Sequence, residues 1–314
     1  MSKILLFLFL LVCTGFDLCY GQKLLLPTEQ GFIKVPGELL YFQRFGVPHT
    51  KTPPIIVLHG GPGMDQSYLL PQMLELAKDH EVIFYDQRGS GKSSTHAVDT
   101  EGMNMKRFVQ DLEAIRKYFS LKKMTLLGHS WGGLLAVEYT IVHPLHVDAL
   151  ILLDSVPMTL NGVKTFDQRC AYRLTKVQTS LDQLQNSVPF QRGDPETVEK
   201  FYYLIFQTYC AKKDDAAKIT LHFSQATAHN APKIEKIFGE NFFNKPYDLR
   251  PQLHRFNIPV LIIQGDQDPI PVTTALETKD ALPHSTLLIL TNCGHFPYVE
   301  QPQKCFQAIK EFLK

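Results

Sequence analysis

Hydrophobic residues along the chain gather in short runs that are separated by stretches of helical periodicity. The apolar runs lie at 55–58, 82–85, 124–127, 147–154 and 258–263. An uninterrupted apolar run is typical of a strand that is covered on both faces, as in a parallel sheet. Between two of these runs, over 104–119, apolar residues recur at the spacing of a helix face. The alternation predicts a doubly wound α/β fold with a mostly parallel central sheet.

The other elements of this core follow from the same patterns. Residues 31–47 spread their apolar positions among glycine and proline, which indicates short antiparallel strands with a turn at Pro36-Gly37. Further elements are expected as helices at 66–77, 272–281 and 303–312 and as a last strand at 286–290.

The rhythm of strands and helices stops at Ser155. Residues 156–248 contain amphipathic stretches, such as 198–206, but no further alternation. This segment predicts a helical cap inserted after the sixth strand, where it would cover the carboxyl edge of the sheet. The core is then divided into a first part, 22–155, and a second part, 249–314.

The first residues have the pattern of a secretory signal peptide. A charged start, Ser2-Lys3, precedes the apolar run 4–12, which is too short to span a bilayer. Small residues favour cleavage after Gly21, so that 1–21 would be removed and Gln22 would come first. We therefore expect a secreted or periplasmic protein without stable membrane insertion after cleavage. A retained membrane anchor is the alternative.

Charge and cysteine content narrow the expected partners. The 32 lysines and arginines nearly match the 31 acidic residues, for a net charge of +1, so nucleic acid is not an expected partner. Of the six cysteines, Cys13 and Cys19 precede the expected cleavage point. The other four could form disulfides, for example between Cys170 and Cys210. The sequence has no Cys-x-x-Cys pair and no His/Cys cluster at zinc spacing, so a metal site is not indicated.

Residues 86–93 include Gly-Ser-Gly-Lys-Ser, which superficially matches the end of a phosphate-binding loop. That motif needs a glycine at position 86, which is Asp86. Nucleotide binding is therefore not indicated. We expect Asp86 and Arg88 to brace neighbouring loops through charge-assisted hydrogen bonds.

The sequence Gly-His-Ser-Trp-Gly at 128–132 joins an apolar run to a helix-like run. A serine in such a sharp turn takes cramped backbone angles, and glycines on both sides leave room for them. We predict that Ser130 is a nucleophile at the carboxyl end of its strand. The amide of Trp131, in the first turn of the next helix, has no intrahelical acceptor and can face a developing oxyanion.

A second glycine-rich turn, His-Gly-Gly-Pro-Gly at 59–63, follows the strand expected at 55–58. Glycines let the backbone come close to a bound group. We expect the amide of Gly61 to be the second oxyanion donor, because this loop follows a strand near the nucleophile and Pro62 has no N–H. A plain glycine-rich turn is the alternative.

A nucleophilic serine needs an imidazole as its base and a carboxylate to orient that imidazole. His295 lies in the loop after the last expected strand, and Asp268 lies in the loop after the strand before it. The chain order is then Ser, Asp, His. Asp266 and Asp154 compete for the role of the acid, and Asp268 is preferred because it lies deeper into its loop.

Five segments together resemble the prolyl iminopeptidase branch of the α/β-hydrolases. They are His-Gly-Gly-Pro-Gly at 59–63, Asp-Gln-Arg-Gly-Ser-Gly at 86–91, Gly-His-Ser-Trp-Gly-Gly at 128–133, Gly-Asp-Gln-Asp at 265–268 and Gly-His-Phe at 294–296. The resemblance implies a serine peptidase, without a cofactor, that releases an N-terminal residue through an acyl-enzyme. That residue is proline in the type enzymes, and the substrate is a short peptide or a small molecule. The resemblance makes Ser130, Asp268 and His295 the nucleophile, acid and base, and the amides of Gly61 and Trp131 the oxyanion hole.

The cap departs from that branch, whose members bind the substrate's amino group with cap glutamates among aromatic residues. Here Trp131 is the single tryptophan, and no cap glutamate matches residue by residue. The candidates, each expected on a solvated helix face, are Glu196, Glu199, Glu235 and Glu240. Two other functions stay open: a carboxylester or lactone hydrolase on the same core, and a non-catalytic binding module that keeps the fold.

Overall fold

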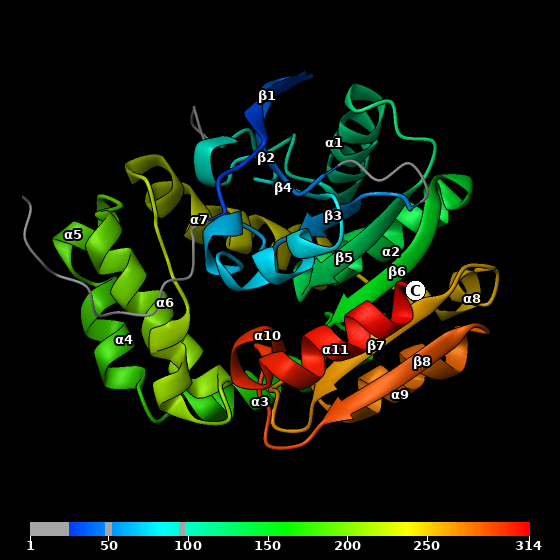
Figure 1. Cartoon of the computed structure of the whole chain (residues 1–314). Helices are drawn as coiled ribbons and strands as arrows, with labels where there is room; N and C mark the ends of the chain where they lie inside the picture. The colour runs from blue at the N-terminus through cyan, green and yellow to red at the C-terminus, as the bar shows by residue number, and fades with distance from the viewer. Residues whose placement is uncertain (1–24, 48–51, 94–97) are drawn as a thin grey trace, which may run out of the picture.

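A computed structural model describes residues 25–47, 52–93 and 98–314 (Figure 1). The signal peptide expected at 1–21 lies outside the described residues. Within them, eight strands form one sheet in the order β1-β2-β4-β3-β5-β6-β7-β8. β1 pairs with β2 and β2 with β4 in antiparallel fashion, and the remaining pairs are parallel. The predicted mostly parallel α/β fold is therefore confirmed.

The apolar runs of the sequence form the central strands, and β3, β4, β5 and β7 are buried along their whole length. The strands are β1 (Glu29–Val35), β2 (Glu38–Phe45), β3 (Ile55–Leu58), β4 (Val82–Tyr85), β5 (Met124–His129), β6 (Val147–Leu153), β7 (Val260–Gly265) and β8 (Ser285–Leu290). Alternate residues of each strand face opposite layers. In β3, Ile56 and Leu58 pack on one side of the sheet and Ile55 and Val57 on the other.

Helices cover both faces of this sheet. The helices of the core are η1 (Gln66–Tyr68), η2 (Gln72–Lys78), η3 (Gly91–Ser93), α1 (Met105–Tyr118), α2 (Trp131–Val142), η4 (Pro144–His146), α8 (Arg250–Leu253), α9 (Val272–Ala281), α10 (Pro297–Glu300) and α11 (Pro302–Phe312). Apolar residues of α1, α2, α8 and α9 belong to one buried cluster, and those of η2, α10 and α11 belong to the other. None of the helices in the described ranges is both long and apolar enough to cross a membrane.

The single helix expected at 66–77 is wrong. The segment forms two short 3₁₀ helices, η1 and η2, and Pro71 lies between them. A proline lacks an N–H and disfavours helical angles in the residue before it, so one continuous helix cannot pass this point. The break places Tyr68, at the end of η1, next to the strand ends.

The segment between β6 and β7 is helical, as expected for a cap after the sixth strand. Its helices are α3 (Leu160–Leu174), α4 (Gln178–Gln185), α5 (Val188–Gln191), α6 (Pro195–Tyr209), η5 (Lys213–Lys218), α7 (Gln225–Phe238) and η6 (Gly239–Phe243). In Figure 1, α4, α5 and α6 stand beside the sheet, at the left of the view. A single β-bridge between Thr159 and Asp248 brings the two ends of the segment together.

Asp86 accepts hydrogen bonds from the amides of Gln66 and Lys92, at 3.1 and 2.8 Å, and Arg88 pairs with Asp111 at 2.7 Å, so both residues brace loops as predicted.

The possible disulfide between Cys170 and Cys210 is not formed. These two cysteines and the other two in the described ranges are free and buried.

Candidate active site

The turn between β5 and α2 has the strained geometry expected for the nucleophile. Ser130 has φ 55° and ψ −120°, and its N–H donates to the carbonyl of Leu153 at 2.9 Å. The flanking glycines are required by close backbone contacts. A Cβ atom on Gly128 would lie 2.3 Å from the carbonyl oxygen of Gly132, and one on Gly132 would lie 2.2 Å from the carbonyl oxygen of Leu58. The predicted cramped conformation of Ser130 is confirmed.

The glycine-rich loop after β3 lies directly against this turn. A Cβ on Gly60 would lie 3.0 Å from the Cβ of Ser130. The Gly60 N–H donates to the hydroxyl of Tyr68 at 2.6 Å and is therefore occupied. The N–H of Gly61 has no hydrogen-bond partner within the described ranges, which keeps it as the candidate donor from this loop. The amide of Trp131 is the corresponding candidate at the start of α2.

His295 and Asp268 meet as a hydrogen-bonded pair at the carboxyl edge of the sheet. His295 Nδ1 lies 2.9 Å from Asp268 Oδ2, and both residues are buried. The other carboxylate oxygen, Oδ1, accepts the N–H of Ile270 at 2.8 Å. Burial alone would raise the pKa of the Asp268 carboxyl, but His295 and these donors hold it below its ordinary value. Ser130 and His295 line the same cavity, of about 390 Å³.

The two competing acids occupy different places. Asp266 is exposed and accepts the N–H of Cys293 at 3.3 Å. Asp154 is fully buried, and its Oδ1 accepts the N–H of Gly265 at 2.8 Å. Burial and the charge of Asp268 raise the pKa of Asp154 well above its ordinary value, which favours the protonated form of Asp154 beside the Asp268 carboxylate. From the sequence, Asp154 was considered only as an alternative to Asp268 for the triad acid. Its position directly after β6 could have predicted that it lies next to Asp268.

A second hydrogen-bonded chain runs beneath the site and was not found from the sequence. His129 is buried, and burial lowers its pKa to about 3, so the imidazole is neutral. Because the Tyr68 hydroxyl accepts from Gly60, it donates to His129 Nδ1 at 2.6 Å. His129 Nε2 then donates to the carbonyl of His295 at 2.8 Å. The chain links the glycine-rich loop, the nucleophile turn and the loop of the histidine.

The cavity beside Ser130 is mostly apolar, and residues of the cap form part of its wall. Its apolar lining includes Met64, Val156, Val163, Phe166, Ile205, Phe206, Phe243 and Phe296. Glu235 of α7 also lines it. Burial raises the pKa of Glu235 to about 7, and the neighbouring Tyr202 hydroxyl opposes that shift. The expectation that Glu235 lies on a solvated helix face is therefore wrong, because the cap places this side of α7 over the cavity.

The other candidate glutamates lie elsewhere. Glu196 pairs with Lys200 at 2.8 Å, and both are largely exposed. Glu199 accepts the backbone N–H of Phe223 at 2.7 Å. Of the four glutamates considered, only Glu235 lies on the lining of the cavity in the described part of the chain.

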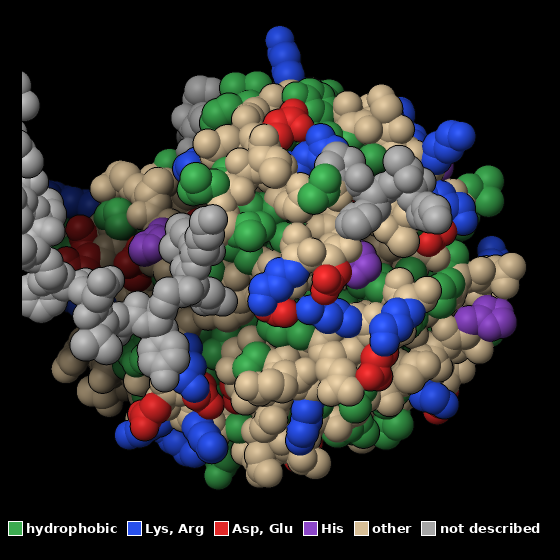
Figure 2. All heavy atoms as spheres, viewed as in Figure 1, with side chains coloured by type: hydrophobic (Ala, Val, Ile, Leu, Met, Phe, Trp, Pro, Cys, Tyr) green, Lys and Arg blue, Asp and Glu red, His purple; other side chains and the backbone are tan. Residues whose placement is uncertain are grey.

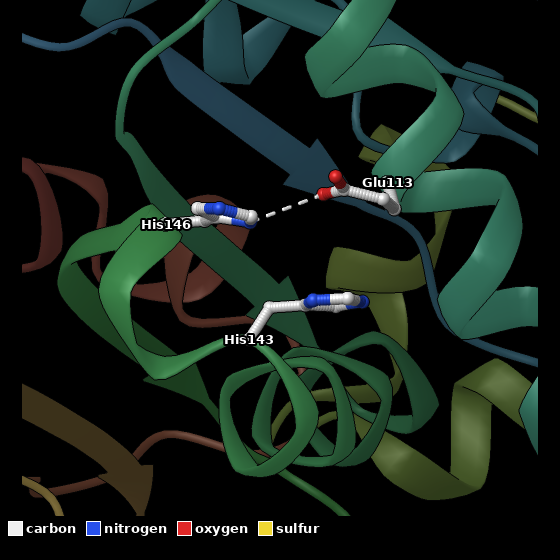
Figure 3. Close-up of side chains that lie close together, drawn as sticks. All are labelled: Glu113, His143 and His146. Carbon is white, nitrogen blue, oxygen red and sulfur yellow. Dashed lines mark ion pairs between the residues drawn. The ribbon is translucent and has the colours of Figure 1, made fainter.

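A separate group of possible metal ligands brings together Glu113, His143 and His146 (Figure 3). His146 Nδ1 lies 3.3 Å from Glu113 Oε2. However, Arg116 already binds both carboxylate oxygens, at 2.7 and 2.8 Å, and the Tyr139 hydroxyl donates to one of them at 2.7 Å. A divalent cation would have to displace the guanidinium. We therefore interpret this group as a structural contact between α1 and α2.

Comparison with known proteins agrees with this geometry. The model of the family described as "alpha/beta hydrolase fold" matches residues 53–302. A proline iminopeptidase of Heyndrickxia coagulans is 30% identical over 290 residues, which cover 90% of this chain and 98% of that protein. A proline iminopeptidase of Saccharolobus solfataricus is 28% identical over 294 residues, which cover 91% and 92% of the two chains.

Solved structures share the fold at lower sequence identity. The proline iminopeptidase of Mycobacterium smegmatis superposes with a TM-score of 0.67 at 20% identity, over 91% of this chain and 97% of that one. The enol-lactonase of Burkholderia xenovorans LB400 superposes with a TM-score of 0.61 at 20% identity, over 90% and 99%. The family model covers most of this chain, and a proline iminopeptidase is 30% identical to it over 90% of its residues. The chain therefore belongs to the α/β-hydrolases, as a prolyl iminopeptidase-like member.

Proposed function

We propose that the protein is a serine aminopeptidase that releases an N-terminal residue, proline or a related small residue, from a short peptide. The observation that carries the proposal is Glu235, an acid on the lining of an apolar cavity that also contains Ser130. A buried ammonium group needs a carboxylate nearby, since neither charge is stable alone in an apolar site. Relatives that are proline iminopeptidases support the same substrate class.

In this proposal Ser130 attacks the carbonyl carbon of the first residue while His295 takes its proton. Asp268 holds the Nδ1–H of His295 and stabilises the imidazolium that forms. The amides of Gly61 and Trp131 donate to the oxyanion of the tetrahedral intermediate. His295 then protonates the leaving amine. In the second half of the reaction His295 takes a proton from a water molecule that attacks the acyl-enzyme carbonyl, and it returns that proton to the Ser130 oxygen as the acid leaves.

Glu235 would bind the substrate's amino group and so restrict cleavage to the first residue. At a pKa of about 7, part of the Glu235 population is protonated at neutral pH, and a bound ammonium would favour the carboxylate form. The apolar side chains of the cap on the cavity lining would shield this contact from water and strengthen it. A peptide with a blocked amino group lacks the positive charge that would pair with Glu235.

The test compares amide and ester substrates on three proteins. Prolyl and alanyl β-naphthylamides and short p-nitrophenyl esters are assayed with the wild type, Glu235→Gln and Glu196→Gln, which changes an exposed cap glutamate. We expect Glu235→Gln to lower kcat/KM for the amides by about 100-fold, a lost charged contact of roughly 2–3 kcal/mol, and to change ester hydrolysis far less. Glu196→Gln should behave as the wild type.

The second candidate is a carboxylester or lactone hydrolase, and the apolar lining of the cavity favours it. The same nucleophile and oxyanion donors can act on any acyl carbonyl. Ester turnover without detectable amide turnover would establish this reading and remove the peptidase. A folded wild type whose Ser130 does not react with a fluorophosphonate would instead support a non-catalytic binding module.

We also propose that the protein is exported, on the pattern of residues 1–21. The mature protein purified from culture medium or periplasm should then begin at Gln22. N-terminal sequencing decides the matter, and an intact Met1 on membrane-associated protein would favour the retained anchor.

A further inference from the structure

Two arginines of the cap hold the loop that carries Asp268. Arg169 and Arg173 lie one helical turn apart on α3. Arg169 donates from Nε to the carbonyl of Pro269 at 2.9 Å and from Nη2 to that of Asp268 at 3.0 Å. Arg173 donates from Nη2 to the carbonyl of Gln267 at 2.6 Å. The cap therefore binds three consecutive carbonyls around the acid.

One of the two arginines, Arg173, also reaches the loop of the base through the end of α6. Arg173 Nη1 donates to the carbonyl of Thr208 at 3.0 Å. The next residue, Tyr209, accepts the backbone N–H of His295 at 3.1 Å, and its ring meets the imidazole edge-on at 5.5 Å between centroids. The acid and base loops are thus joined through cap residues as well as through their own 2.9 Å hydrogen bond.

We propose, on the basis of the serine hydrolase function above, that Arg169 and Arg173 are positioning residues that hold Asp268 in line with His295. A planar guanidinium that makes two hydrogen bonds fixes direction as well as distance. Neither arginine lies on the cavity lining, so neither contacts the substrate. The cap then contributes to the proton relay and not only to the walls of the pocket.

If Arg169 and Arg173 acted only through their positive charges, their removal would shift the pH–rate profile in the opposite direction. Two positive charges beside Asp268 disfavour a proton on the neighbouring imidazole, so their removal would move the acidic limb of the pH–rate profile to higher pH. Loss of alignment has the opposite sign, because a well-placed carboxylate stabilises the imidazolium. In the described part of the chain the titratable groups near His295 also include Asp154, His129, Tyr209 and Glu300, and they are unchanged in the variants below.

The experiment uses the full chain with the pairs Arg169→Lys/Arg173→Lys and Arg169→Gln/Arg173→Gln. Lysine keeps the positive charge but lacks the paired N–H donors of the planar guanidinium. Lys164→Gln, an exposed change on the same helix, is the control. The readouts are kcat and KM on an aminoacyl amide, the pH profile of kcat/KM, and the rate of Ser130 labelling by a fluorophosphonate, each measured well below the unfolding temperature of the variant.

We expect the lysine pair to lower kcat and the labelling rate by about 10- to 100-fold, the cost of a small misplacement of a catalytic group, with KM changed less than about threefold. Its acidic limb should move to lower pH. A lysine pair with wild-type rates, or a profile that moves to higher pH, overturns the proposal. So does a pair that only lowers the unfolding temperature and leaves kcat and the profile unchanged.

The labelling rate separates this proposal from the peptidase assignment. A wild type that is labelled but cleaves no aminoacyl amide removes the aminopeptidase function, and the labelling rates of the variants still decide the role of the arginines. A wild type that is neither labelled nor active overturns both.

Discussion

At the scale of single residues, the nucleophile turn requires glycines because the surrounding backbone leaves no room for a Cβ atom. A Cβ on Gly132 would lie 2.2 Å from the Leu58 carbonyl oxygen, within a backbone that cannot move without shifting β3. We expect Gly132→Ala to lower the free energy of unfolding by about 3 kcal/mol or more, since overpacking against backbone relaxes poorly. Thermal or urea unfolding measures this change.

Gly239 supplies the matched control, because a Cβ there meets nothing within 4 Å. Gly239→Ala should change stability by less than about 1 kcal/mol, the ordinary difference between glycine and alanine in a helix. A Gly132→Ala protein as stable as Gly239→Ala would mean that the turn is looser than described.

The stability of the fold should also depend on the protonation of Asp154, which lies beside Asp268 and His295. Asp154 has its pKa raised first by burial and then by the charge of Asp268, so the folded protein binds a proton there that the unfolded chain releases above about pH 4. Its folded state therefore becomes less stable, relative to an uncharged substitute, as pH rises. Asp154→Asn keeps an oxygen for Gly265 and offers an N–H to Asp268.

We expect Asp154→Asn to match the wild type near pH 4 and to become the more stable protein at higher pH, by up to about 1.4 kcal/mol for each pH unit, the linkage slope for one proton. Unfolding curves between pH 4 and 8 provide the measurement. A variant that loses stability as pH rises would show that Asp154 is ionised in the fold.

Which residues could be predicted in advance depends on where their partners lie in the chain. Ser130 is recognisable because its requirement for glycine is met within two residues on each side. Glu235 is not, because α7 also carries the exposed Lys233 and Lys236, and only the placement of the cap decides which side faces the cavity. The bond between Tyr68 and His129 joins positions 61 residues apart, which no local pattern indicates.

At the scale of elements, the Glu113 carboxylate of α1 accepts a hydrogen bond from the Tyr139 hydroxyl of α2 at 2.7 Å and pairs with His146 of η4 (Figure 3). Burial would raise the pKa of Glu113, but Arg116 and the Tyr139 hydroxyl lower it to about 2. The stabilisation is therefore present above the pKa of the unfolded chain, near 4.5, and is lost as pH falls toward 2. This contact connects two helices on the same face of the sheet.

We expect Glu113→Gln to lower the free energy of unfolding at pH 7 by roughly 1–3 kcal/mol, because charged hydrogen bonds are lost and Arg116 is left without its partner. The difference from the wild type should shrink as pH falls toward 2. Lys106→Gln, an exposed change on α1, is the control. An unchanged difference at all pH values would exclude the ion pair as its source.

The elements themselves were predicted where one pattern dominates. Apolar runs with no polar interruption located β3, β4 and β5, and the helix predicted at 272–281 has the observed bounds of α9. The helix at 66–77 was not, since its apolar spacing suggested one helix and Pro71 divides it in two. Where a turn residue and a periodicity disagree, the covalent restriction of proline prevails.

At the scale of the whole molecule, cap and core are fastened together around the triad. Besides the two arginines of α3, the Glu300 carboxylate of α10 accepts the N–H of Ala211 at 2.7 Å and the N–H of Gly294 at 2.9 Å, so the segment after α6 in the cap and the loop of His295 share one carboxylate. The face drawn in Figure 2 intersperses basic and acidic side chains, in keeping with the net charge of +1. The hydrogen bonds that Arg169, Arg173 and Glu300 make between cap and core predict that cap and core unfold as one unit.

The four buried cysteines report on that cooperativity, because Cys170 and Cys210 lie in the cap and Cys293 and Cys305 in the core. Burial raises the pKa of each thiol above its ordinary value, to about 12 for Cys170, so iodoacetamide should label none of them in the folded protein. In a urea series with peptide mapping by mass spectrometry, we expect all four to become reactive at the same urea concentration. The core pair is the internal reference. If the cap pair reacts at lower urea, the cap unfolds before the core, and the hydrogen bonds between them do not make the two unfold as one unit.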